Sequence, residues 1–185
     1  MAIENEIKYV LCSDELEQIL CPLYGYHDVI QGYMNNSNRI RKSTYQNGKE
    51  DCYFTFKHRL PNGKNIEIEK NFNSSEFEEL WEFTKEKVSK RRVSIFPKKD
   101  EIELNHWKNV IQWDIDFIRW GSGKNHFIIA EVEMLSFMEK PLGILPILKP
   151  YIIHEVAKQD NRFTARKLSD EKHAIKLAKE LGLIN

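Results

Sequence analysis

The stretch Glu4-Asn5-Glu6-Ile7-Lys8, close to the start of the chain, shows the pattern from which the fold can be predicted. Successive side chains of an extended strand point to opposite faces, so Glu4, Glu6 and Lys8 would share one face while Ile7 points to the other. We therefore expect a first strand over residues 3–11, with one charged face and one apolar face. Most of the later strands repeat this pattern.

The same spacing, with two polar residues on either side of a single residue, recurs in later segments. The pairs are Arg39 and Arg41, Thr55 and Lys57, Glu67 and Glu69, Lys90 and Arg92, Asp114 and Asp116, and Glu131 and Glu133. For any one segment, the solvated face of an ordinary antiparallel sheet is the simpler interpretation. Such a face usually mixes serine, threonine, lysine and glutamine, whereas here acids and bases are segregated by strand. The whole pattern favours strands that surround a polar tunnel able to bind metal and polyphosphate.

The length of the turn in a predicted hairpin decides which of these residues share a face. A two-residue turn at Asn47-Gly48, after the strand that carries Arg39 and Arg41, would put Lys57 on the face opposite these two arginines. A three-residue loop, Gln46-Asn47-Gly48 with a left-handed glycine last, is a common alternative. This loop places Thr55 and Lys57 on the same face as the two arginines.

Two further hairpins are predicted, with a loop at Pro61-Asn62-Gly63 and a turn centred on Gly123-Lys124. They give four cross-strand pairs on the charged face: Lys57 with Glu67, Thr55 with Glu69, Asp116 with Glu131, and Asp114 with Glu133. Acids that face each other repel unless a cation lies between them, and a metal ion would supply that cation. The segment 121–124 lacks the spacing of a phosphate-binding loop, so we interpret it as a turn between strands.

Capping signals and hydrophobic spacing predict the helices. The strongest prediction covers residues 75–89, where Ser75 and Glu78 would form a capping box. A last amphipathic helix opens at Ser169-Asp170-Glu171 and ends near Gly182. Its apolar side would most simply dock on the apolar exterior of the barrel, and a dimer surface is the alternative. The other expected elements are a helix from Asp14 to about Leu20 that Pro22 ends, a strand over Lys90–Phe96, a turn at Pro97–Asp100, an extended region to Ile118, a strand over Phe127–Leu135, and a largely irregular segment 136–151.

Length and charge limit the class of protein. A chain of 185 residues suits a single domain, residues 1–185. Its 28 basic residues balance its 28 acidic ones, so no overall field would attract nucleic acid or a membrane, and no apolar run approaches the roughly 20 residues that span a bilayer. Cys12, Cys21 and Cys52 have no Cys-x-x-Cys spacing, and the histidines have no His-x-x-x-His spacing. We expect a cytoplasmic protein with free thiols.

The order of the motifs resembles that of the CYTH superfamily, the triphosphate tunnel metalloenzymes, from residue 4 to about residue 170. The resemblance is carried by Glu4-x-Glu6-x-Lys8, Gln31-Gly32-Tyr33, Arg39-x-Arg41, Thr55-x-Lys57, Glu67-x-Glu69, Trp113-x-x-Asp116, Ala130-Glu131-x-Glu133 and the late Glu155-Val156, Asp160 and Arg162. It implies an α+β fold: an eight-stranded antiparallel β-barrel that forms a tunnel with a charged lumen, flanked by helices on the outside.

The resemblance also implies ligands for each group of residues. A small-molecule triphosphate would be held by basic residues, namely Lys8, Arg39, Arg41, Lys57, Lys90, Arg92 and Arg162. Mg²⁺ or Mn²⁺ would be held by carboxylates, with Glu4, Glu6, Glu131 and Glu133 ahead of Glu67, Glu69 and Asp116. Glu4, Glu6 and Lys8 are the expected catalytic residues.

Metal-dependent hydrolysis of inorganic triphosphate, or of a related organic triphosphate, is therefore the leading prediction. A class IV adenylate cyclase that makes cyclic AMP from ATP is one alternative, although such cyclases usually carry further residues ahead of the first strand. A non-catalytic protein that binds polyphosphate or nucleotides is another, although binding an anion needs no carboxylates. Inorganic and thiamine triphosphate are not distinguished by the sequence, nor is a monomer from a homodimer.

Overall fold

The computed structural model describes residues 2–13, 15–61, 64–98, 100–119 and 125–184, with the backbone alone for residues 2–4. Its strands are β1 (Ala2–Glu4), β2 (Glu6–Leu11), β3 (His27–Tyr33), β4 (Asn38–Tyr45), β5 (Glu50–Arg59), β6 (Asn65–Phe72), β7 (Glu86–Ile95), β8 (Val110–Arg119), β9 (Asn125–Met134) and β10 (Ile152–Val156). Its helices are α1 (Glu15–Tyr24), α2 (Ser74–Trp81), α3 (Ala165–Leu168) and α4 (Glu171–Glu180), with 3-10 turns at Lys149–Tyr151 and Asn161–Phe163. The fold is α+β, as predicted.

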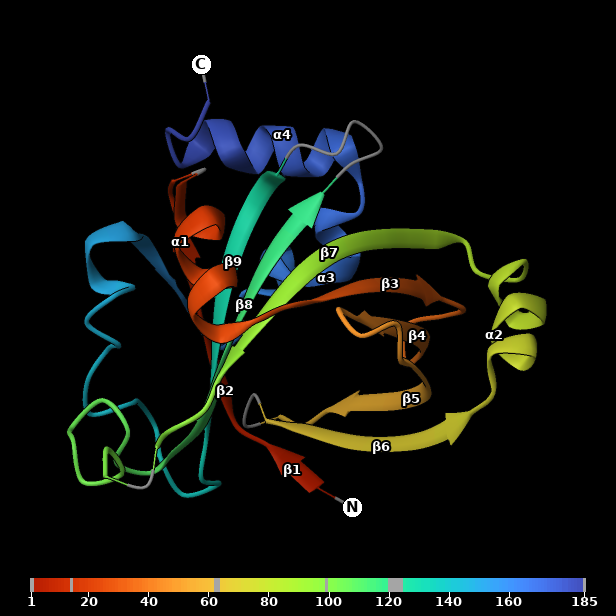
Figure 1. Ribbon diagram of the computed structural model, residues 1–185. Coiled ribbons are helices and arrows are strands. Elements are labelled where there is room, and N and C mark those ends of the chain that lie inside the picture. Colours follow the sequence, from red (N-terminus) through yellow and green to blue (C-terminus); the bar gives the residue numbers. More distant parts are fainter. Residues whose placement is uncertain (1, 14, 62–63, 99, 120–124, 185) are drawn as a thin grey trace.

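The strands form one curved antiparallel sheet in the order β1-β6-β5-β4-β3-β7-β8-β9-β2-β10 (Figure 1). The predicted first strand is broken at Asn5 into β1, which pairs with β6, and β2, which pairs with β9 and β10. The buried Asn5 amide holds this break, because its Nδ2 donates to the Leu135 and Met138 carbonyls at 2.9 and 2.7 Å. The N-terminal segment thus contacts strands from both ends of the order.

The pairing registers define which side chains share a face of the sheet. We call the face that carries Lys8 and Glu131, which are direct partners between β2 and β9, the inner face. The predicted registers of the first two hairpins are confirmed: Arg39 faces Thr55, and Lys57 faces Glu67. Asn62 and Gly63, in the loop predicted for the second hairpin, lie outside the described residues. Gly48 has a φ of 81° and closes the predicted three-residue loop, because the Tyr45 N–H donates to the Lys49 carbonyl at 2.9 Å.

The predicted register of the third hairpin is wrong by two residues. Asp114 faces Glu131, and Asp116 faces Ile129. A shift in register between Ile118 and Arg119 precedes the turn, whose residues 120–124 lie outside the described ones. An offset of two keeps every side chain on its face, so the four acids of this hairpin still share the inner face.

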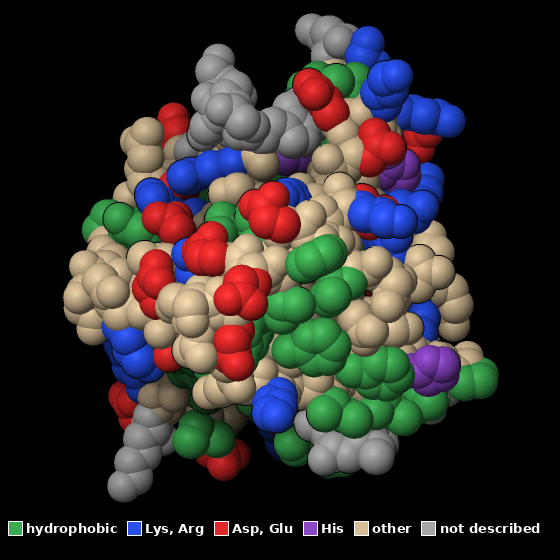
Figure 2. Space-filling view, turned by 90° about the vertical axis from the view of Figure 1, so that its right-hand side faces the viewer, with side chains coloured by type: hydrophobic (Ala, Val, Ile, Leu, Met, Phe, Trp, Pro, Cys, Tyr) green, Lys and Arg blue, Asp and Glu red, His purple; other side chains and the backbone are tan. Residues whose placement is uncertain are grey.

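The outer face of the sheet is covered in two places. Leu16 and Leu20 of α1 pack with Trp113 and other outward side chains of β2, β7, β8 and β9, and together they form the largest buried cluster. On β4 and β5, Phe77 of α2 covers Ile40. Beside α2, the cross-strand neighbours Phe56 and Ile68 remain exposed, and Figure 2 shows hydrophobic side chains gathered on this side of the molecule.

The C-terminal helix lies elsewhere than predicted. Ala174 and Leu177 of α4 pack with Val10, Ile118 and Ile129. These three are inner-face residues, because each is separated by two positions from a charged inner-face residue of its own strand. In Figure 1 this helix crosses the ends of β8 and β9. The inner face is therefore charged along part of its length and apolar at the end that α3 and α4 cover.

The helix predicted over residues 75–89 is wrong in its second half. Helix α2 ends at Trp81, and its capping box is formed by Asn73 and Glu76, not by Ser75 and Glu78. Residues 86–95 form β7, so this strand begins before the predicted residue 90. Val88 follows Phe77 at a distance of about three helical turns, and this coincidence made a strand residue fit the helical pattern.

Three further boundaries differ from the predictions. Pro22 lies within the last turn of α1, and Gly25, with a φ of 74°, ends this helix. Residues 101–109, predicted to be extended, form turns that bury Trp107. Strand β10 was not predicted. The predictions for β9, for the irregular segment 136–151 and for a last helix that opens at Ser169-Asp170-Glu171 are confirmed, and Asp170 is the N-cap of this helix. None of the helices in the described ranges is long and apolar enough to span a bilayer.

Candidate functional site

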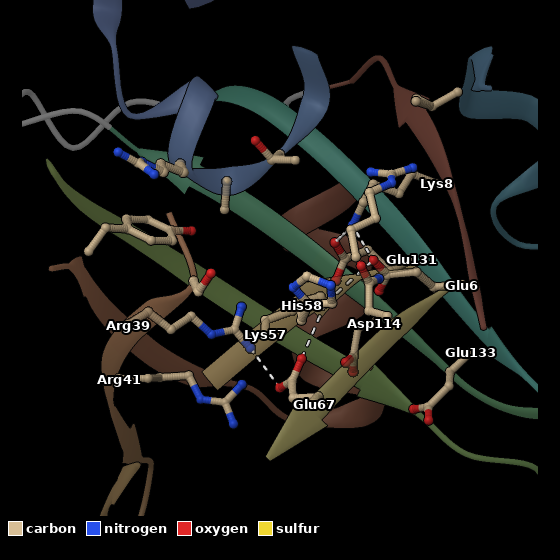
Figure 3. A pocket seen from close by; sticks show the side chains of 18 of the residues that line it. Glu6, Lys8, Arg39, Arg41, Lys57, His58, Glu67, Asp114, Glu131 and Glu133 are labelled. Carbon is tan, nitrogen blue, oxygen red and sulfur yellow. Dashed lines mark hydrogen bonds and ion pairs between the residues drawn. The ribbon is translucent and has the colours of Figure 1, made fainter. Parts of the chain in front are cut away.

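A cavity of about 580 Å³ opens on the inner face of the sheet (Figure 3). It collects charged residues that the sequence distributes over the whole chain. The predicted site residues that line it are Glu6, Lys8, Arg39, Arg41, Lys57, Glu67, Glu69, Lys90, Arg92, Glu131 and Glu133. The shared charged face that the alternation predicted therefore surrounds a single cavity.

Lys8 lies between two acids at one side of this cavity. Its Nζ donates to a carboxylate oxygen of Glu131, its partner on β9, and lies 3.2 Å from Oε1 of Glu6 on its own strand. Burial lowers the pKa of the Lys8 ammonium, but the two carboxylates outweigh burial and raise that pKa above its usual value. Lys8 is thus a buried cation held by acids from β2 and β9.

Arg92 connects three acids on the neighbouring strands. Its guanidinium binds Asp116 through Nε and Nη2 at 2.6 and 2.7 Å, Asp114 through Nη1 at 2.7 Å, and Glu131 through Nη2 at 3.1 Å. Burial raises the pKa of Glu131, but Lys8 and Arg92 outweigh it and hold that pKa well below the usual range. Glu131 is therefore an ionised carboxylate shared by two cations.

Lys90 is the most enclosed basic group of the cavity that was predicted from sequence, at 5% exposure. Its Nζ lies 2.5 Å from Oδ2 of Asp116. Burial and the nearby Arg92 charge lower the pKa of Lys90 to about 8, although Asp116 opposes them. The Asp116 carboxylate thus holds this ammonium in a place that otherwise disfavours its charge.

The strands β4, β5 and β6 supply the opposite wall. Arg39 Nη2 lies 2.9 Å from Oε1 of Glu67, and Arg41 Nη2 lies 3.0 Å from Oε1 of Glu69. Lys57 Nζ lies 3.2 Å from the other oxygen of Glu67. Figure 3 shows these three basic side chains with their charged ends near Glu67. On this wall, carboxylates orient the basic groups.

Glu133 differs from the other acids of the cavity. Within the part of the chain that the structure describes, it makes no ion pair, and its side chain stands apart in Figure 3. Burial, together with the charges of Asp114, Glu6 and Glu67, raises the pKa of Glu133. Lys57 opposes this rise without cancelling it, so an added cation beside Glu133 would relieve the repulsion from its acidic neighbours.

Three predicted site residues are not part of the cavity wall as described. Asp116 is 2% exposed and lies behind Lys90 and Arg92. Arg162 is half exposed and pairs with Asp160 and Glu180. The side chain of Glu4 lies outside the described part of the structure, although its backbone pairs with β6.

The cavity also contains basic residues that were not predicted. They are Arg59 at the end of β5, Lys158 after β10, and Arg166 on α3. Arg166 reaches the Asn36 side chain at 2.6 Å and Glu86 at 2.8 Å. Lys158 would have been found if the β-branched run that forms β10 had been recognised, whereas the four residues of α3 have no periodic signal.

No group of three or more histidine, cysteine, aspartate or glutamate residues is arranged to hold a metal ion within the described ranges. The carboxylates around Lys8 and Arg92 are instead turned toward these two basic side chains. Any divalent cation would therefore have to compete with ammonium and guanidinium groups for these oxygens.

Together these features define an α+β protein whose curved antiparallel sheet encloses a cavity lined by both acids and bases. No protein-family model matches this chain, and no curated protein matches it. Among solved structures, it is similar to one described as "Conserved hypothetical protein Pfu-838710-001 from Pyrococcus furiosus", with a TM-score of 0.47 and 15% sequence identity. That similarity covers 98% of this chain and 92% of the other.

Proposed function

We propose that this protein hydrolyses a triphosphate, inorganic or organic, with the help of Mg²⁺ or Mn²⁺. One observation carries the proposal: arginines from β4 and β7 line the same cavity as carboxylates from β2 and β9. A triphosphate carries several negative charges, and guanidinium groups can bind its oxygens in pairs. Carboxylate oxygens are the ligands that Mg²⁺ prefers. A cavity that only bound an anion would have no use for acids such as Glu133.

We also infer that the sheet closes into the eight-stranded barrel that the CYTH resemblance implies. The pairing of β1 with β6 and of β2 with β9 supports this inference, since Asn5 alone separates β1 from β2. If β1 and β2 count as one broken strand, β10 is an addition outside the closed circle. An ion pair of 3.7 Å between Lys57 of β5 and Glu6 of β2 also supports it, because these strands are far apart in the sheet order.

The residues of the cavity divide into three roles in this proposal. Arg39, Arg41, Lys57, Arg92 and Lys8 bind phosphate oxygens, with the previously unpredicted Arg166 at the edge of the cavity. Glu67 and Glu69 hold Arg39 and Arg41 in place, and Asp116 holds Arg92 and Lys90. We assign these acids to positioning, because each lies against the basic group that it would orient.

The metal ion would be held by Glu6, Glu131 and Glu133, together with Glu4 and Asp114. The chemistry of this set fits a hard divalent cation, because all the donors are carboxylates. Burial and the charges of Asp114, Glu6 and Glu67 raise the pKa of Glu133 and outweigh the opposing charge of Lys57, so an added cation would relieve the repulsion among these acids. When bound, such an ion neutralises charge on the triphosphate and favours in-line attack by water. The protein itself would keep the triphosphate extended between Arg39, Arg41 and Arg92.

Two rival functions can be separated from this one by their products. A cyclase would release cyclic AMP and pyrophosphate from ATP, and a binding protein would release nothing. The test is a panel of inorganic triphosphate, thiamine triphosphate and ATP, each with Mg²⁺, Mn²⁺ or EDTA, in which orthophosphate and cyclic nucleotide are measured separately. We expect metal-dependent orthophosphate release and no cyclic product. Cyclic AMP from ATP would overturn the proposal.

The ligand assignment has its own test. The double variant Glu4→Gln with Glu6→Gln should lose metal-dependent turnover while its circular dichroism spectrum and urea midpoint stay close to those of the wild type. A Lys42→Gln variant is a suitable control, because this lysine lies on the outer face and pairs with Glu78 of α2. Turnover that persists in the double variant would refute the assignment of Glu4 and Glu6.

A further inference from the structure

The Lys8 ammonium occupies a position at which a cation bridges two carboxylates. It contacts Glu6 at 3.2 Å along its own strand and bonds to Glu131 on the neighbouring strand. The side chains of Lys8 and Glu6 are only 18% and 21% exposed. Figure 3 shows Lys8, Glu6 and Glu131 converging at one side of the cavity.

A divalent cation held between Glu6 and Glu131 would compete with Lys8 for Oε1 of both acids, because the other Glu131 oxygen, Oε2, already accepts from Arg92 Nη2 at 3.1 Å. An ammonium and a metal ion cannot both be in contact with two carboxylate oxygens at this spacing, since they repel each other and fill the same volume. The four-carbon stem of lysine is flexible, so Lys8 can move away from the acids while its backbone stays in β2. Its neighbours within the cavity would then be phosphate oxygens.

We propose that Lys8 is an exchangeable cation that holds the metal position closed until triphosphate binds, so that metal and triphosphate bind cooperatively. This inference rests on the proposed function. Triphosphate would draw Lys8 away from Glu6 and Glu131 and leave their oxygens to the metal. By thermodynamic linkage, the metal would raise the affinity for the anion by the same factor. The protein without triphosphate would therefore bind the metal weakly, and Lys8 would be the residue that couples the two ligands.

A matched pair of variants tests the exchange without any turnover. Lys8→Met removes the ammonium and keeps an unbranched side chain. Lys158→Met removes one positive charge from the same cavity, but Lys158 Nζ contacts the Asn5 side-chain oxygen at 3.2 Å and makes no ion pair with a carboxylate among the described side chains. Both variants thus change the total charge of the cavity equally, and only the first vacates the position between Glu6 and Glu131.

The measurement is the dissociation constant of Mn²⁺ alone, by calorimetry or by electron paramagnetic resonance of free Mn²⁺. We expect Lys8→Met to bind Mn²⁺ at least tenfold more tightly than the wild type, which is within the usual range of coupling between sites. The dissociation constant of Lys158→Met for Mn²⁺ should differ from that of the wild type by less than about threefold. Sulfate, an anion that binds free Mn²⁺ weakly, should tighten Mn²⁺ binding to the wild type but not to Lys8→Met. Equal gains in the two variants would overturn the proposal.

A second readout on the wild-type protein covers the case in which Lys8→Met does not fold. Crystals soaked in Mn²⁺ and sulfate should give an anomalous peak between the Glu6 and Glu131 carboxylates, with Lys8 Nζ displaced toward the anion. A Mn²⁺ peak elsewhere in the cavity, with Lys8 still between the two acids, would overturn the proposal while leaving metal-dependent hydrolysis intact. Absence of both Mn²⁺ binding and metal-dependent hydrolysis would instead refute the proposed function.

Discussion

Asp114 on β8 lies directly opposite Glu131 on β9, on the charged part of the inner face. Two carboxylates in this relation repel each other, and the pair is stable here because the Arg92 guanidinium donates to both, at 2.7 and 3.1 Å. Asp114 and Glu131 therefore need a cation between them, and a metal site built on these acids requires either Arg92 or another cation to remain there. Arg92 is therefore a structural residue as well as a ligand in the proposed function.

Replacing Arg92 by methionine should lower the free energy of unfolding by about 3 kcal/mol, because a buried ion pair that loses one partner leaves its acids uncompensated. The check is urea denaturation at pH 7 in the presence of EDTA. Arg162→Met is the control, since Arg162 is half exposed and its solvent-screened pairs with Asp160 and Glu180 should contribute far less to stability. Equal losses in the two variants would show that Arg92 does not hold these acids together.

Arg39 should be sensitive to a change that preserves its charge. Arg39→Lys keeps one positive charge but loses the planar fork that binds phosphate in pairs, so kcat/KM for inorganic triphosphate should fall by about tenfold or more. Arg162→Lys, away from the cavity, should leave kcat/KM within about twofold of the wild type. The measurement is initial-rate phosphate release with Mg²⁺. If both variants behave alike, Arg39 does not contact the substrate.

Gly32 on β3 is required by close packing against Thr84. A Cβ at this position would lie 2.6 Å from Thr84 Cγ2 and 2.7 Å from Thr84 Cβ. Gly32→Ala should therefore cost about 1–3 kcal/mol of stability, the usual range for overpacking. Thr84→Ala in the same chain removes Cγ2 but not Cβ, so it should restore only part of the loss in urea denaturation. A stable Gly32→Ala protein would contradict this account of the glycine in Gln31-Gly32-Tyr33.

The faces of the strands could be predicted from the sequence because parity survives errors of two residues. The offset that placed Asp114, and not Asp116, opposite Glu131 still left all the acids of the third hairpin on the inner face. The end of α2 could not be predicted in this way, because Val88 fits both a helical and an alternating pattern. The break at Asn5 depends on carbonyls of Leu135 and Met138, which no local pattern near residue 5 reveals.

Within the candidate site, strand residues were predictable and residues on short elements were not. Arg39 and Lys57 follow from alternation, whereas Arg166 lies on a helix of four residues and reaches the cavity only through tertiary packing. Arg162 illustrates the reverse error. It has the expected charge, but Asp160 and Glu180 hold it outside the cavity wall. Alternation in the sequence identifies the charged residues of the strands, but tertiary packing decides which charged residues enter the cavity.

Glu133 should show opposite effects on stability and on metal binding. Glu133→Gln removes a carboxylate that burial and three neighbouring acids disfavour, so the protein without metal should become more stable by a few tenths of a kcal/mol, after allowance for solvent screening. The same variant should bind Mn²⁺ more weakly, because a donor is lost. Urea denaturation in EDTA and Mn²⁺ calorimetry measure the two effects. Glu139→Gln, an exposed acid outside the cavity, is the control. A variant that loses stability without losing Mn²⁺ affinity would contradict the assignment.

His126 on β9 should make the fold sensitive to acid. Its Nε2 lies 3.2 Å from the Leu168 carbonyl, and burial lowers its pKa to about 4, from about 6.5 in an unfolded chain. The folded state thus binds the proton less readily than the unfolded state, so the contribution is fully present above pH 6.5 and is lost as pH falls toward 4. Partial exposure reduces the expected loss to about 1–2 kcal/mol. We expect His126→Gln, which keeps a donor for Leu168, to flatten the difference in urea midpoint between pH 7.5 and pH 5 relative to the wild type. An unchanged difference would mean that other groups carry the whole acid sensitivity and that His126 is readily protonated in the folded protein.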